Sequence, residues 1–195
     1  MILLIVALAA IVIGLVRGGR IEGLSSVPFR GGLAVLILFV VQAVVRQFIP
    51  ELGILSTGVL VLSWVVVSAC LLVLCALNWR TVGVRLLALG IALNIVVVAL
   101  NIGMPVGGPL AARLGMAPSA ESIANRGAFY QPVDSGTVAP LLGDVIPIPA
   151  PQPLRSLVSM GDVLMFLAVG VLIEETIRRA RYRPRHSVGS HESLT

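Results

Sequence analysis

The chain contains no lysine, and charged residues of all kinds make up only 12% of its 195 residues. A soluble globular domain carries about 25% charged residues, because a surface in contact with water needs a polar coat. Hydrophobic residues make up 57% of this sequence, and its mean hydropathy is +1.03. These values exclude an ordinary water-soluble domain for most of the chain, so we predict that a lipid bilayer is its main solvent and partner.

Histidine and cysteine are scarce, which limits the chemistry that the chain can perform. The only histidines, His186 and His191, lie near the C-terminus and outside every apolar run. A haem held by two histidines, a histidine metal site and a serine–histidine triad therefore have no ligand or base within the apolar part. Cys70 and Cys75 are five residues apart in an apolar run, so a helix points them to different sides. We predict no cofactor, no metal site and no catalytic residue.

Five apolar runs follow one another along the sequence. A helix needs about 20 apolar residues to cross the hydrocarbon core of a bilayer, and the runs approach or exceed this length. A cleavable signal peptide would carry positive charge before its apolar core, whereas here Arg17 follows the first run. The sequence therefore predicts an all-α integral membrane protein with about five transmembrane helices. The expected spans lie near residues 1–16, 33–49, 52–77, 86–102 and 157–173.

The arginines predict the orientation of these helices. With five spans, residues 17–30, residues 80–85 and the C-terminal tail share one side, and they hold most of the 14 basic residues. Arginine-rich short loops stay in the cytoplasm. We therefore predict an outside N-terminus, a membrane domain over 1–177 and a basic cytoplasmic tail over 178–195. A four-span chain, in which the first or last run fails to cross, is the alternative. Because the arginines gather at the ends of apolar runs, we predict no nucleic-acid partner.

A long Pro/Gly-rich loop, residues 103–156, joins the fourth and fifth spans on the predicted extracytoplasmic side. Pro105 and Pro109 prevent a simple continuation of the fourth helix, and Gly107 with Gly108 lets the backbone turn. Two short helices lying on the membrane are expected, over residues 110–117 and 119–124.

Prolines alternate with apolar residues over 141–153. Such a run cannot be a helix, and its prolines remove donors that a central strand would need. We expect an extended, polyproline-like segment that lies across the outer mouth of the helices or dips into it.

Four polar side chains make up a candidate site. Asp162 follows Ser159 by three residues, the spacing of a helix N-cap and an acid that the helix dipole favours. It also falls within an apolar span, where a carboxylate needs a partner such as Arg155, Asn101 or water. Asp144 is either a turn acid capping its own loop or a second member of an external site. The candidate polar cluster is therefore Asn101, Asp144, Arg155 and Asp162, and the choice between capping and ligand binding stays open.

Two further patterns predict how the helices contact one another. Asn94 and Asn101 lie on one stripe of the fourth span, where an amide in hydrocarbon is expected to face a neighbouring helix. Ala88 and Ala92 form a small-residue pair that would let another helix approach. In the last helix, Glu174 and Arg178 are an i,i+4 pair, as are Glu175 and Arg179, so this helix is predicted to run on beyond the membrane.

Three motifs carry a resemblance to a known family: Asn101-Ile-Gly-Met-Pro-Val106, Leu142-Gly-Asp-Val-Ile-Pro-Ile-Pro149 and Ser159-Met-Gly-Asp-Val-Leu164. In this order around a variable loop, they resemble the signature of a bacterial family of small multi-pass membrane proteins. That family is classed as a domain of unknown function and is found in actinobacteria and clostridia-like groups. In it the first motif usually reads Asn-Gly-Gly, often with a basic residue before Met-Pro-Val, whereas here Ile102-Gly103 is shorter and the basic residue is absent. The resemblance implies a multi-pass topology in the bacterial cytoplasmic membrane and carries no assigned activity.

The sequence leaves two kinds of function open. The first is a non-enzymatic membrane protein whose external loop caps the helix bundle and binds a partner protein or a lipid. The second is a membrane-embedded enzyme or carrier for a lipid-linked or small apolar substrate, with Asp144, Asp162 and Arg155 at the outer mouth. Convergence of these side chains and Asn101 on a roomy cleft would favour the second function, and purely local capping would favour the first.

Overall fold

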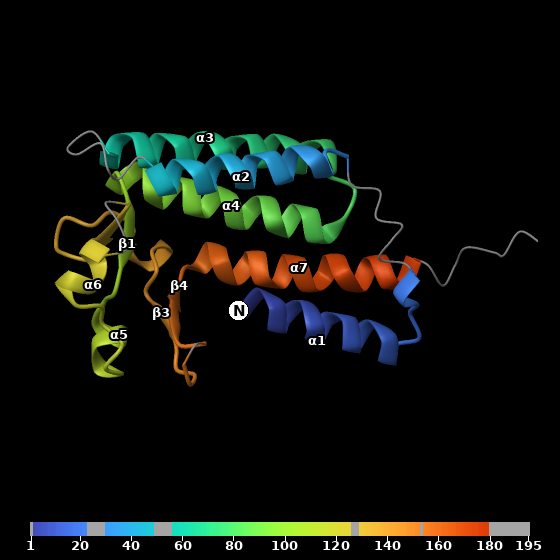
Figure 1. Ribbon diagram of the computed structural model, residues 1–195. Helices are drawn as coiled ribbons and strands as arrows, with labels where there is room; N and C mark the ends of the chain where they lie inside the picture. Colours follow the sequence, from blue (N-terminus) through green and yellow to red (C-terminus); the bar gives the residue numbers. More distant parts are fainter. Residues whose placement is uncertain (1, 23–29, 49–55, 126–128, 153, 180–195) are drawn as a thin grey trace, which may run out of the picture.

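Five long helices and a folded cap make up the part of the chain that the structure describes, residues 2–22, 30–48, 56–125, 129–152 and 154–179. In this computed structural model the long helices are α1 (Ile2–Val16), α2 (Gly32–Phe48), α3 (Ser56–Leu77), α4 (Val82–Asn101) and α7 (Met160–Arg179). They lie side by side. The described residues between α4 and α7, which are 102–125, 129–152 and 154–159, form the cap at one end of the helices (Figure 1). The prediction of a mainly helical fold is confirmed. The predicted basic tail lies outside the described residues from residue 180 onward.

The last long helix lies inside the bundle. α7 packs against both α1 and α4, α4 packs against α3, and α3 packs against α2. The neighbour order is therefore α1, α7, α4, α3, α2, with α1 and α7 in one layer and α2 and α3 in the other (Figure 1). α1 and α7 run in the same direction, because Arg20, just after α1, donates its backbone N–H to Ile177 O near the end of α7 at 3.2 Å.

Two of the described helices are long and apolar enough to cross a membrane by length and composition. They are Thr57–Leu77, within α3, and Val82–Asn101, which is the whole of α4. Two shorter apolar helices, Leu4–Val16 and Gly32–Val45, lie within α1 and α2. The structure thus supplies two helices of spanning length, and the five-span topology stays a prediction.

Glycines allow α4 and α7 to approach closely. A Cβ atom added to Gly90 would lie 2.6 Å from Gly161 O, and a Cβ added to Gly161 would lie 2.6 Å from Gly90 O. Side chains at either position would force the helices apart, as at other crossings of small residues. Of the predicted small-residue pair, Ala88 belongs to a cluster against which Met165 and Leu172 of α7 pack. Ala88 is buried in this cluster with Cys75, and Ala92 is only half-buried.

Two glutamates of α7 join the helix ends opposite the cap. Glu174 accepts a hydrogen bond from Arg17 and pairs with Arg178, whose Nη1 lies 3.7 Å from Glu174 Oε1. Glu175 Oε1 accepts the backbone N–H of Val82 at 3.2 Å, in the first turn of α4. The predicted continuation of the last helix through its glutamates is confirmed, because α7 extends to Arg179.

The cap contains short strands, so the prediction of an all-α fold is wrong in this detail. β1 (Met104–Val106) pairs in parallel with β2 (Tyr130–Pro132), and β3 (Ile146–Ile148) pairs antiparallel with β4 (Ser156–Val158). Asp144 forms a further parallel bridge with Val106, so that β1 lies between β2 and residue 144. The remaining elements are α5 (Pro109–Arg113), α6 (Ala120–Asn125) and the 3-10 helix η3 (Pro140–Leu142).

The proline-rich run is extended as predicted, and it also pairs. An antiparallel two-stranded ladder uses the donors of alternate residues only. Pro147 stands opposite Leu157 in β4, while Ile146 and Ile148 flank it in the register. At position 147 the strand needs no backbone N–H for the ladder, so proline there removes no hydrogen bond. This explains why a strand forms although the prolines predicted none.

Capping residues move two predicted helix boundaries. α4 begins at Val82 rather than residue 86, because Thr81 Oγ1 accepts the backbone N–H of Val84 at 3.3 Å. α7 begins at Met160 rather than residue 157, because Ser159 caps it and the residues before that cap are extended in β4. The two short helices of the loop are confirmed as α5 and α6, of which α5 is shorter than predicted.

A Gly161→Ala substitution tests the close crossing of α4 and α7. We expect it to lower the free energy of unfolding by about 1–3 kcal/mol or more, because the new methyl group overlaps Asn94 Oδ1 and the backbone of Gly90. The measurement is reversible unfolding in mixed detergent micelles. Gly58→Ala is the matched control, since nothing lies within 4 Å of a Cβ there. Equal stability of the two variants would contradict the crossing.

Candidate functional site

A closed ring of hydrogen bonds joins α4 to the start of α7. Asn94 Nδ2 of α4 donates to Asp162 Oδ1 at 2.9 Å, and Ser159 Oγ donates to Asn94 Oδ1 at 2.8 Å. The backbone N–H of Asp162 donates to Ser159 Oγ at 2.9 Å, and that of Ser159 donates to Asp162 Oδ2 at 3.3 Å. Three side chains thus satisfy one another across the interface of two helices.

The ring contains the N-cap that the sequence predicts. Ser159 and Asp162 exchange side-chain and backbone bonds, as in a capping box, and two free N–H groups at the start of α7 gain acceptors. Asp162 also stands at the positive end of the helix dipole, which favours its negative charge. The capping prediction for Ser159 and Asp162 is therefore confirmed.

The partner of Asp162 differs from those predicted. We expected Arg155, Asn101 or water, and the described partner is Asn94, two helical turns before Asn101 on the same stripe. Asp162 lies in the first turn of α7, and the close crossing at Gly161 brings that turn level with Asn94. The sequence indicated that Asn94 would face another helix, and this is confirmed.

The ring fixes the direction of the Asn94 amide. Its oxygen accepts from Ser159, and its nitrogen donates to the carboxylate of Asp162, which accepts only. Asn94 is 3% exposed and Ser159 is 0% exposed. Removing one member would leave buried groups without partners, which costs about 1–3 kcal/mol each.

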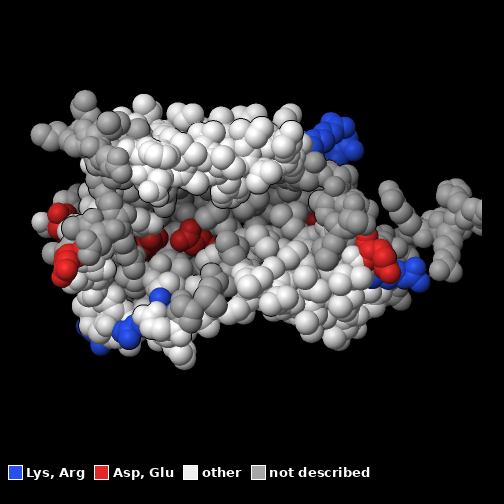
Figure 2. Space-filling model, viewed as in Figure 1, with Lys and Arg blue, Asp and Glu red and all other residues white. Residues whose placement is uncertain are grey.

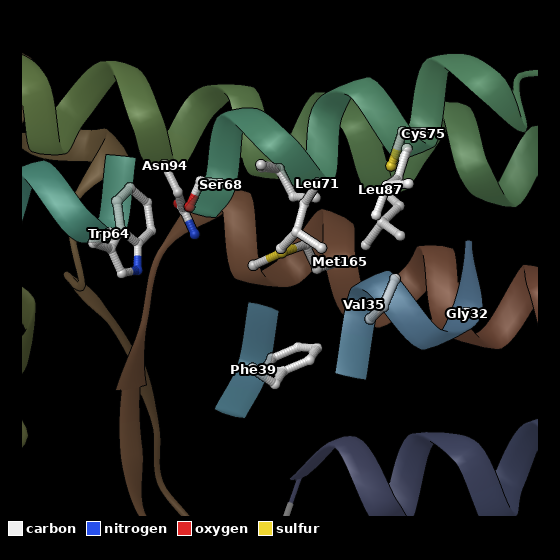
Figure 3. A pocket seen from close by; sticks show the side chains of 12 residues that line it. Gly32, Val35, Phe39, Trp64, Ser68, Leu71, Cys75, Leu87, Asn94 and Met165 are labelled. Atoms are coloured by element: carbon white, nitrogen blue, oxygen red, sulfur yellow. The ribbon is translucent and has the colours of Figure 1, made fainter. Parts of the chain in front are cut away.

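Next to this ring, a cavity of about 420 Å³ opens between α2, α3, α4 and α7 (Figure 3). Its lining is almost wholly apolar and includes Phe39 of α2, Trp64 and Leu71 of α3, Ile91 and Asn94 of α4, and Met165 of α7. The volume lies within the range of about 300–1,000 Å³ that is usual for small-molecule sites. The cavity exists because α2 packs chiefly against α3 and leaves space between itself and α7.

The few polar groups of the cavity lie at the end beneath the cap. Figure 3 shows Asn94, Ser68 and Trp64 at one end, while Cys75 and Leu87 lie toward the other. The Trp64 ring packs on Phe129 of the cap, with ring centroids 5.6 Å apart. The cap is thereby attached to α3 at the same end of the cavity that holds the amide of Asn94.

The surface is hollowed on this side of the molecule. In the space-filling view a depression runs between the layer that contains α2 and the layer that contains α1 and α7, and acidic atoms show within it (Figure 2). This depression lies between α2 and α7. α2 packs against α3, and no comparable packing of α2 against α7 is described.

Asn101 holds the cap on the end of α4. Its side chain exchanges two hydrogen bonds with the backbone of Val138, Nδ2 to O at 2.9 Å and N to Oδ1 at 2.8 Å. Its backbone oxygen accepts from Gln131 Nε2 at 2.8 Å. Ile102, which follows, ends the helix in the left-handed conformation at φ 51°. The first motif is therefore a helix end that anchors the loop.

Asp144 and Arg155 also lie in the cap. Asp144 is 8% exposed, and its backbone bonds both Pro105 O at 2.8 Å and the N–H of Gly107 at 3.1 Å. Arg155 is exposed and donates from Nη2 to Gly115 O at 2.6 Å. None of the described bonds joins Asn101, Arg155 and Asp162 to one another. Their joint action with Asp144 as one ligand site stays a prediction.

Three polar residues of the site, Asn94, Ser159 and Ser68, were not among the predicted candidates. Asn94 entered the sequence argument only as an amide that faces another helix. Ser159 entered the sequence argument only as a cap, and Ser68 was one of several hydroxyls in a long apolar run. The signal that could have found Ser68 is its place four residues after Trp64, on one face of α3. Within the described chain, no group of three His, Cys, Asp or Glu side chains gathers to hold a metal ion. The arrangement can bind an apolar molecule and donate hydrogen bonds at one end of it.

Paired serine substitutions test the ring. Ser159→Ala removes a hydroxyl that bonds both Asn94 and Asp162, so we expect the free energy of unfolding to fall by about 1–3 kcal/mol. Ser156→Ala is the matched control, because Ser156 Oγ is buried with no hydrogen-bond partner among the described residues. The control is expected to keep or slightly raise stability in the same detergent unfolding assay. A larger loss in Ser156→Ala than in Ser159→Ala would refute the ring.

Comparison with known proteins places the chain in a family. No curated protein and no solved structure matches it. Residues 2–174 match a family of unknown function, DUF5317, and this range includes all five long helices up to Glu174 together with the cap. The predicted resemblance to a domain of unknown function is confirmed to that extent, while the bacterial range and the family motifs stay predictions. Since the match covers most of the sequence, the chain belongs to the family of unknown function DUF5317.

Proposed function

We propose that this protein is a multi-pass integral membrane protein that binds one lipid molecule in the cavity between α2, α3, α4 and α7. In this proposal the five long helices cross the bilayer and the cap covers their extracytoplasmic end. The protein acts by binding, without catalysis. The observation that carries the proposal is the apolar cavity of about 420 Å³ that opens beside the lipid-facing helix α2.

Lipid contact is supported by the outer faces of the helices. Leucine, valine and phenylalanine side chains of α2 and α3 are exposed, among them Leu36, Val40 and Val73. Figure 2 shows charged side chains near the two ends of the molecule and in the hollow, with an uncharged surface between them. In water such faces would drive association, whereas hydrocarbon is a suitable solvent for them.

The charge distribution supports an orientation with the cap outside. Arg17, Arg30, Arg80 and Arg178 are described at the helix ends opposite the cap. Positive residues are retained on the cytoplasmic side of a membrane. The proposed location is the bacterial cytoplasmic membrane, with the N-terminus outside and the C-terminal tail in the cytoplasm.

A lipid is a better occupant of the cavity than water. A water molecule needs two to four polar partners, and the lining offers polar groups at one end only. A chain molecule can pass from the bilayer into the space between α2 and α7, because α2 packs chiefly against α3. The apolar length of the cavity then takes the chain, and the end near Asn94 takes the head.

The described geometry favours binding over catalysis. Both oxygens of Asp162 accept bonds that hold α7 in place. Arg155 is occupied by Gly115 in the cap. The enzyme or carrier hypothesis needs these groups to act together on a substrate, so it is the weaker of the two.

Cysteine labelling tests the proposed topology. In a background with Cys70→Ser and Cys75→Ala, we introduce either Ser135→Cys in the cap or Arg80→Cys at the opposite end, since both positions are exposed. A membrane-impermeant maleimide is expected to label Ser135→Cys in intact bacterial cells, and Arg80→Cys only after permeabilisation. Labelling of Arg80→Cys alone in intact cells would show that the orientation is the opposite of the proposed one. Labelling of both cysteines would place residues 80 and 135 on the same side and would contradict a single span between them.

Filling the cavity tests lipid binding. Leu71→Trp adds bulk to a side chain that points into the cavity (Figure 3), so we expect less lipid to remain bound per protein after purification. Val73→Trp is the matched control on the outer face of the same helix. Bound lipid is extracted and quantified by mass spectrometry after exhaustive detergent washing. The proposal is wrong if Leu71→Trp, folded as the wild type, retains as much lipid as Val73→Trp.

A further inference from the structure

We infer that the ligand of this cavity is a neutral lipid whose head is a carbonyl group, bound by the Asn94 amide and the Ser68 hydroxyl. This inference rests on the proposed function and names the ligand class of the same cavity. It depends on which hydrogen-bonding groups the cavity presents, on the charge around them and on their depth.

The polar end of the cavity presents donors. Asn94 uses its oxygen for Ser159 and one of its two N–H groups for Asp162, and the described residues supply no acceptor for the second N–H. Ser68 is 6% exposed and lines the same cavity, and no hydrogen bond of its hydroxyl is described. Two buried donors at one end of an apolar space call for an acceptor on the ligand.

Asp162 makes the Asn94 side chain a donor. Because a carboxylate accepts only, it holds the NH₂ group of Asn94 on its own side of the amide, and Ser159 occupies the amide oxygen. Asn94 therefore cannot turn to offer its oxygen to a ligand hydroxyl without breaking the ring. A carbonyl oxygen on the ligand can accept from Asn94 and from Ser68 together, since such an oxygen has two lone pairs.

The charge around the polar end excludes an anionic head. All the residues that line the cavity are neutral, and the carboxylate of Asp162 is bonded to Asn94. A phosphate placed there would meet a negative charge with no arginine in the lining to balance it. Burial of an unpaired charge is costly, so the head must be neutral.

The depth of the site points to the same conclusion. Asn94 precedes Asn101, at the cap end of α4, by seven residues, which is about 10 Å along a helix. The cap lies over this end, where Phe129 packs on Trp64. A phospholipid bound by its ester groups would place its phosphate close to this depth, beneath the cap and beside Asp162. A small carbonyl head without a charged group places no charge at that position.

The fluorescence of Trp64 reports on the occupant directly. The chain has two tryptophans, so Trp79→Phe leaves Trp64, in the cavity wall, as the only emitter. The protein is reconstituted in uncharged lipid vesicles with one of three probes that share a brominated alkyl chain: the hydrocarbon, the methyl ester or the monoalkyl phosphate. Bromine quenches tryptophan on contact. A Trp64→Phe, Trp79→Phe, Val66→Trp variant, with its tryptophan on the exposed face of α3, measures quenching by the bulk bilayer.

We expect the ester to quench Trp64 at about fivefold lower mole fraction than the hydrocarbon, the ratio that a net hydrogen bond supplies. The phosphate should be the weakest probe. Ser68→Ala should lower the preference for the ester by at least about twofold. Ser63→Ala is its control, because Ser63 bonds Leu60 O of its own helix and does not line the cavity. Asn94→Leu should abolish the preference, and if that variant fails to fold, Ser68→Ala decides.

The outcomes separate this inference from the proposed function. Equal quenching of Trp64 by ester and hydrocarbon, with both above the Val66→Trp control, would overturn the carbonyl head and leave lipid binding intact. Strongest quenching by the phosphate would also overturn it. If no probe quenches Trp64 more than the bilayer control, the cavity holds no lipid and the proposed function fails with the inference.

Discussion

The hydrogen-bonded contact between Asn94 and Asp162 is the constraint on which the rest of the structure depends. An amide and a carboxylate at the crossing of two apolar helices each need a partner, because hydrocarbon and apolar side chains offer none. Their bond, with Ser159 closing the ring, sets both the depth and the rotation of α7 on α4. Gly90 and Gly161 make the bond possible, since they bring the backbones close enough for these short side chains to meet.

The position of the cap follows from the same contact. Ser159 is the one residue between β4 and α7, so fixing the first turn of α7 also fixes the strand before it. β4 then holds β3, and Asp144, just before β3, is bonded to β1 at the end of α4. Asn101 completes the attachment from the α4 side through Val138. Three short polar motifs far apart in the sequence thereby define one end of the bundle.

The sequence was sufficient for local features and insufficient for those that depend on distant pairing. Apolar runs, prolines and the Ser159–Asp162 spacing predicted the helices, the extended run and the cap of α7, since each rests on neighbouring residues. The predicted partner of Asp162 was wrong. A sequence stripe shows which face of a helix an amide occupies, but it does not show which residue of a neighbouring helix lies at the same level. The parallel pairing of β1 with β2 joins residues separated by a loop with two helices, and no short-range pattern indicates it. No sequence pattern indicates the cavity either, because it results from the space that α2 leaves between itself and α7.

Asn94 connects the stability of the bundle with the chemistry of its cavity. The bonds that hold α7 use the oxygen and one N–H of this amide and leave the other N–H beside an apolar space. A residue placed only for packing would need no such remaining donor. The ring keeps the amide in one orientation before any ligand enters, so a ligand loses little free energy in ordering it. Under the proposed function, fold and recognition place the same demand on position 94, namely a side chain that accepts once and donates twice.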